Sequence, residues 1–134
     1  MDPTIRREKP ENEYYFKEGC HILELSNVSD DPQVSIARAR VAPGVTTRPH
    51  RLDGITERYV ILQGCGKVTL GGRPAQVVSP GDVVIIPSGC PQQIANDGDG
   101  DLIFLAICTP RFVPEAYREM AGEVASSPDT AKGD

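Results

Sequence analysis

The sequence predicts a small all-β barrel, and three observations support that fold class. Twelve prolines and thirteen glycines are spread between short apolar runs. This pattern disfavours long helices, because proline removes a helical hydrogen-bond donor and glycine costs about 1 kcal/mol in a helix interior. The runs are rich in β-branched residues and end at turn-forming sequences such as PG, GG and PSG. About eight such runs within roughly 90 residues are typical of a closed barrel or jelly roll.

The expected strands lie within residues 20–109, which we interpret as the barrel. Their ranges are His21–Ser26, Val34–Val41, Glu57–Gln63, Lys67–Leu70, Ala75–Val78, Asp82–Ile86, Gln92–Ala95 and Leu102–Cys108. Residues 1–19 are polar, and we interpret them as an N-terminal arm that becomes ordered by packing on a neighbour.

A short C-terminal helix is expected over residues 110–125. Apolar side chains recur there at helical spacing, and Pro114 is tolerated in a first helical turn. The apolar positions are Phe112, Ala116, Met120 and Val124. The small polar residues 126–134 predict a flexible tail.

Composition restricts the range of functions. The 134 residues suffice for one domain, and 14 basic against 19 acidic side chains give a net charge of −5. An acidic chain without a basic cluster is a poor partner for nucleic acid or an anionic membrane. The N-terminus has no apolar segment typical of a signal peptide, so we expect a soluble, cytoplasmic protein. Four widely spaced cysteines indicate reduced thiols.

Two segments share a pattern of glycine, proline and polar residues. Gly44–Gly64 reads GVTTRPHRLDGITERYVILQG, with His50 and Glu57 between its terminal glycines. Gly81–Asn96 reads GDVVIIPSGCPQQIAN, in which a Pro-Ser-Gly turn follows an apolar run. Together these segments resemble the two motifs of the cupin family, over about residues 33–108. The resemblance implies a small single-domain cupin, a double-stranded β-helix that forms a jelly-roll barrel.

The chain departs from the cupin pattern at two positions. Leu52 stands where the first motif has its second histidine, and Gln92 stands where the second motif has its histidine. In the family these positions converge on one divalent metal inside the barrel. The resemblance therefore implies His50, Glu57 and Gln92 as metal ligands, with the identity of the metal (Mn, Fe, Ni or Zn) left open. Cys90 or Cys108 is an alternative donor in place of Leu52.

Two functions remain open at this point. The first is a metal-dependent oxygenase, isomerase or lyase acting on a small polar substrate, with Glu57 or Tyr59 moving a proton. Strand alternation places these two side chains on one face. The second is a non-catalytic cupin that binds or senses a small ligand at a degenerate metal site, because Leu52 and Gln92 make the cavity less charged. The fold alone does not distinguish the two.

The expected partners are a small molecule and a second copy of the chain. Arg48 and Arg51 flank His50 and are candidates to clamp an anion, although solvated surface arginines are the simpler interpretation. A barrel this small has sheet edges to cover, which favours a homodimer formed through those edges or through an exchanged N-terminal strand.

Overall fold

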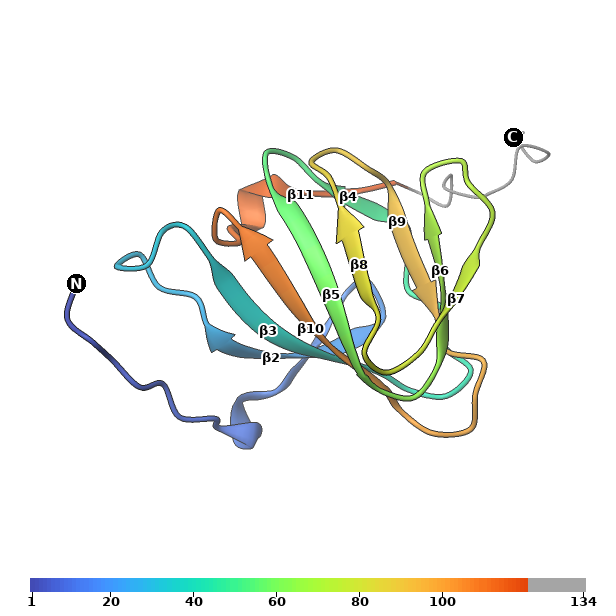
Figure 1. Cartoon of the computed structure of the whole chain (residues 1–134), viewed down its shortest axis with the longest axis horizontal. Coiled ribbons are helices and arrows are strands. Elements are labelled where there is room, and N and C mark those ends of the chain that lie inside the picture. The colour runs from blue at the N-terminus through green and yellow to red at the C-terminus, as the bar shows by residue number, and fades with distance from the viewer. Residues whose placement is uncertain (121–134) are drawn as a thin grey trace.

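The computed structural model describes residues 1–120 as two antiparallel sheets that face one another (Figure 1). The first sheet has the strand order β1-β2-β3-β10-β5-β8 and the second the order β11-β4-β9-β6-β7. The first contains β1 (Tyr14–Phe16), β2 (Cys20–Ser26), β3 (Ser35–Val41), β5 (Thr56–Gln63), β8 (Val83–Ile86) and β10 (Leu102–Thr109). The second contains β4 (His50–Leu52), β6 (Gly66–Leu70), β7 (Gln76–Val78), β9 (Gln92–Ala95) and β11 (Tyr117–Glu119). The expected jelly-roll fold is confirmed.

Strand alternation decides which side chains enter the barrel. Along β5 the side chains of Glu57, Tyr59 and Ile61 are buried, and their neighbours on the strand are more exposed. β5 pairs with β10 so that Glu57 lies opposite Cys108 and Ile61 opposite Phe104. The inner faces of the two sheets thus meet in an apolar core, as expected for strands with one buried face.

Two motif residues have structural roles. Gly64 has φ +81°, and a Cβ there would lie 2.6 Å from the carbonyl oxygen of Asp101, so only glycine fits this turn. The side-chain amide of Asn96 donates hydrogen bonds to the carbonyl oxygens of Val41 (2.9 Å) and Gly100 (2.8 Å). Gly64 and Asn96 of the cupin pattern therefore stabilise the closed barrel and do not bind a ligand.

The prediction of a helix over residues 110–125 is wrong for residues 110–120. In its place η2 (Pro114–Ala116) makes a single 3-10 turn and β11 follows it. β11 pairs with β4, with Tyr117 opposite Leu52 and Glu119 opposite His50. Pairing satisfies the open edge of β4, which a helix would leave without hydrogen-bond partners. Residues 121–125 and the tail expected over 126–134 lie outside the described residues.

The N-terminal segment lies along the first sheet of its own chain. β1 pairs with β2, so the sheet includes a strand ahead of residue 20. Before it, η1 (Pro10–Asn12) and its flanking residues run past β3, where Glu8 binds Arg38 (2.8 Å) and Glu13 binds Arg40 (2.8 Å). Within residues 1–120, no helix is long and apolar enough to cross a membrane.

Candidate functional site

A cavity of about 70 Å³ lies at the end of the barrel where β5 begins and β10 ends. Strands of both sheets contribute to its wall, and β1 and β11 border it. This volume suits a ligand of a few non-hydrogen atoms rather than a drug-sized molecule.

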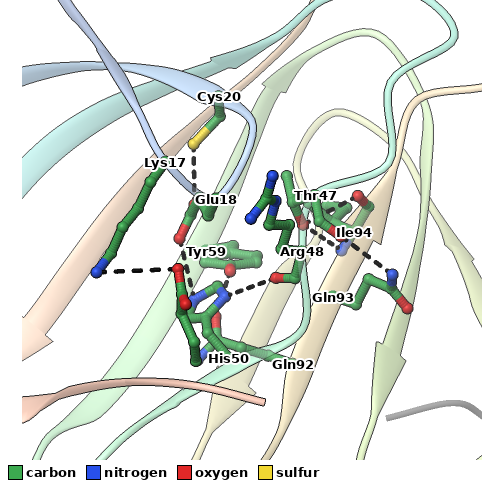
Figure 2. A network of polar contacts seen from close by, with 11 residues as sticks. Lys17, Glu18, Cys20, Thr47, Arg48, His50, Tyr59, Gln92, Gln93 and Ile94 are labelled. Carbon is green, nitrogen blue, oxygen red and sulfur yellow. Dashed lines mark hydrogen bonds and ion pairs between the residues drawn. The ribbon is translucent and has the colours of Figure 1, made fainter. Parts of the chain in front are cut away.

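Of the sequence-predicted site residues, two line the cavity, whereas Gln92 and Tyr59 do not. His50 and Glu57 line the cavity, and both side chains are buried. His50 on β4 lies opposite Gln92 on β9. Deeper in the barrel, the hydroxyl of Tyr59 donates a hydrogen bond to Oε1 of Gln92 (Figure 2). The Gln92 side chain also interacts with the carboxyl group of Glu57.

Glu18 belongs to the site and was missed in the sequence. It lies in the turn between β1 and β2, and its Oε1 is 3.3 Å from Nε2 of His50. Its Oε2 accepts a hydrogen bond from Sγ of Cys20 at 2.9 Å, so Glu18 lies between the two side chains (Figure 2). The backbone N–H of Arg48 donates to the carbonyl oxygen of Glu18 at 2.6 Å, which fixes the turn against the barrel.

The contacts of His50 define how its ring is protonated. Nδ1 lies 3.1 Å from the carbonyl oxygen of Arg48, which only accepts, so Nδ1 carries a hydrogen. Nε2 faces the carboxyl group of Glu18. Nε2 and the Glu18 carboxyl group are therefore within ion-pair distance of one another. The ring of Tyr117 stacks on the imidazole at 5.0 Å between centroids and holds its orientation.

Glu57 is a buried acid. Burial raises its pKa to about 8, the neighbouring Glu18 carboxylate adds to the rise, and the Gln92 amide opposes it. At neutral pH the carboxyl group is therefore mostly protonated. Its Oε1 is buried and has no hydrogen-bond partner within the described residues.

The donor atoms fit the divalent metal implied by the resemblance poorly. Leu52 has no donor atom and packs against Ile55, Cys108 and Ala116. Oε1 of Gln92 already accepts a hydrogen bond, and Nε2 of His50 faces Glu18. Within residues 1–120, no group of three or more His, Cys, Asp or Glu side chains is placed to hold a metal ion.

The cysteines and arginines do not complete a metal or anion site. Cys108 lines the cavity, but burial raises the pKa of its thiol, and the more distant Cys90 also has a raised pKa because of burial. The arginine next to His50 along β4, Arg51, binds Asp53 at 2.9 Å. Among the described residues, neither Arg48 nor Arg51 lines the cavity.

Known proteins share this architecture and this sequence pattern. A family model described as Cupin domain matches residues 37–108. An uncharacterized protein of Methanocaldococcus jannaschii is 34% identical over 104 residues, which is 76% of this chain and 82% of the relative. An oxalate-binding protein of Thermotoga maritima is 32% identical over 90 residues, which is 67% of this chain and 73% of the relative.

Among solved structures, Pac13 of Streptomyces, a nucleoside dehydratase, superposes with a TM-score of 0.71. The alignment covers 88% of this chain and 92% of Pac13 at 18% identity, so the likeness concerns the fold alone. Together with the family match and the two relatives, the two sheets and their motif residues show that the chain belongs to the cupin domain family.

Proposed function

We propose that this cupin binds a small polar molecule in the cavity between Glu18, His50 and Glu57. The observation that carries the proposal is the carboxyl group of Glu57, whose Oε1 faces no partner within the described residues. A buried oxygen without a partner costs about 1–3 kcal/mol. A fold that keeps such an atom at the wall of a cavity has a binding point for a polar ligand.

Proton transfer to the bound molecule is a second candidate function. Protonated Glu57 is a donor, and the His50–Glu18 pair is an acceptor on another side of the cavity. Groups whose surroundings set different proton affinities are the usual basis for acid and base roles in one site. Tyr59, the other catalytic candidate, has its hydroxyl engaged with Gln92, and burial raises its pKa well above the ordinary value. We assign it the positioning of Gln92.

A metal held by His50, Glu57 and Gln92 has weaker support. The family resemblance favours the metal. Against it, Leu52 has no donor atom, and the His50 and Gln92 atoms that would bind a metal already contact Glu18 and Tyr59. The proteins similar to this chain include both a binding protein and an enzyme: one relative is an oxalate-binding protein, and one structural neighbour is a nucleoside dehydratase.

Thermal melting with a panel of small probes tests the proposal. The probes are acetate and oxalate as anions, acetamide and propanediol as neutral molecules, tetramethylammonium and choline as cations, and manganese, nickel and zinc ions. We expect at least one organic class to stabilise the native protein, because a ligand at a hundredfold excess over its Kd adds about 2.7 kcal/mol. Elemental analysis of the purified protein checks for stoichiometric metal.

The matched variants are Glu57→Leu and Glu115→Gln. Glu57→Leu removes the free oxygen from the cavity and should abolish the stabilisation, whereas Glu115 is exposed outside the cavity and its substitution should leave the stabilisation intact. No response to any organic probe, or an equal response in Glu57→Leu, would contradict binding at this place. Stabilisation by metal ions alone would favour the metal site.

A further inference from the structure

We propose that the ligand of this cavity is a small organic cation, an alkylated or methylated ammonium. The inference rests on the proposed function, because it names the chemical class that the same cavity takes. Two features carry the inference: the cavity wall has carboxyl groups and, among the described residues, no lysine or arginine, and aromatic rings border it.

Carboxyl groups reach the cavity from three separate elements. Glu57 comes from β5, Glu18 from the β1–β2 turn and Glu24 from β2. Among the described residues, no lysine or arginine lines the cavity. Glu18 faces the imidazole of His50, which leaves Glu57 and the rim carboxyl group of Glu24, itself beside Tyr14, to interact with a ligand. An anion entering this space would find no compensating cation, and burial of an unpaired charge is costly.

Aromatic rings form another part of the wall. Tyr14, Phe16 and Phe112 line the cavity beside the carboxyl groups. Ring faces attract cations, and aromatic side chains are the usual surroundings of methylated ammonium groups in proteins. Such a ligand places its methyl groups against the rings and its positive charge near Glu57.

Tyr117 contributes a hydroxyl group rather than a ring face. His50 stacks on its ring, and Nζ of Lys17 lies 4.9 Å from the ring centroid. The Tyr117 hydroxyl oxygen is buried and has no hydrogen-bond partner within the described residues. It can accept a hydrogen bond from an N–H or O–H of the ligand. Glu57 and Tyr117, each with a buried oxygen that has no partner within the described residues, thus line one cavity.

Calorimetric titration with two molecules of the same shape separates charge from size. Choline and 3,3-dimethyl-1-butanol differ in that a carbon replaces the charged nitrogen. We expect choline to bind the native protein at least tenfold more tightly than the alcohol. A bound cation favours the ionised form of Glu57, which is mostly protonated in the empty cavity, so choline binding should release its proton. Glu57→Gln keeps the volume but does not ionise, so it should weaken choline binding at least tenfold and leave binding of the alcohol nearly unchanged.

Two further variants keep the test informative. Glu24→Gln removes a rim carboxylate and should weaken choline binding even where Glu57→Gln folds poorly, as judged by its melting curve. Glu115→Gln, outside the cavity, should bind choline as the native protein does.

The possible outcomes separate this inference from the proposed function. If the alcohol binds as tightly as choline, or if oxalate binds in place of both, the cation inference is wrong and the binding cavity stands. If manganese binds and choline does not, the site is a metal site and the organic cation is ruled out. If no small probe of any charge binds, both the inference and the proposed function fail.

Discussion

The two ends of the barrel are built from the same strands but are filled differently. At one end, inward side chains such as Ile61, Phe104 and Leu102 form a continuous apolar core. At the other end, Glu57 on the same face of β5 borders a cavity together with His50. Strand alternation therefore decides that a side chain points inward, but the chemistry of the side chain decides whether the interior becomes core or site.

The difference is also energetic. Burial of apolar side chains at the closed end stabilises the fold, whereas burial of a carboxyl group at the open end disfavours its charged form. Such a division is common in proteins, in which polar groups at functional sites are maintained at some cost in stability. Substitutions at the two ends should therefore change different properties.

The largest effect is expected for Ile61→Ala in the core. Ile61 is 1% exposed, and a large-to-small substitution at such a position costs about 2–5 kcal/mol because it leaves a void. Urea denaturation measures the loss. Leu62→Ala on the same strand is the control, because Leu62 is 48% exposed and its removal should change stability by about 0.5 kcal/mol or less. Equal losses in the two variants would contradict the division of β5 into core and surface faces.

A smaller and pH-dependent effect is expected for Glu57→Gln at the cavity. The ordinary pKa of this carboxyl group is 4.5 and burial raises it to about 8. The native protein keeps a proton that the unfolded chain loses, so the stability that Glu57 contributes falls as the pH rises from about 4.5 to 8. The loss is on the order of a few kcal/mol.

Urea denaturation of the native protein and of Glu57→Gln at pH 5.5 and pH 9 measures this dependence. The variant should lose less stability between the two pH values, because an amide does not ionise. Parallel losses in both proteins would mean that Glu57 is already charged in the folded state at neutral pH.

The smallest effect on the fold is expected on the outer surface of the barrel. Val83 and Ile85 are exposed apolar residues on β8, which is an edge strand. We predict that a homodimer forms through this edge. Ile85→Lys should halve the mass measured by light scattering and change the stability of the barrel only slightly. Val77→Lys, on the edge strand β7 of the other sheet, should leave the dimer intact. A monomeric native protein would remove the prediction.

The sequence predicted the closed end of the barrel better than its open end. The strands of the core are marked by apolar runs and by turn residues, and their predicted ranges agree with β2, β3 and β5 within a few residues. The short strands β1, β4 and β11 carry no such signal, because they contain no β-branched residue, unlike the equally short β7. They form because neighbouring strands offer edges to pair with.

The site residues also differ in how well the sequence predicted them. His50, Glu57 and Gln92 could be found because the family pattern fixes their spacing. Glu18 could not, since it lies outside both motifs and approaches His50 only through the fold. The one local signal was the Glu-Gly sequence before a strand, which indicates a turn but not the direction of the carboxyl group. Gly19 has φ +109°, as that tight turn requires.

The origin of Glu18 has a consequence for how this binding site can change. A carboxyl group supplied by a hairpin turn is independent of the inward row on β5 that holds the barrel together. Substitutions at residues 17 and 18 can therefore alter the charge, and with it the selectivity, of the cavity while the apolar core remains intact. The hairpin is a separable module for redesign, and a grafted turn with a basic residue at position 18 should weaken the preference of the cavity for cations.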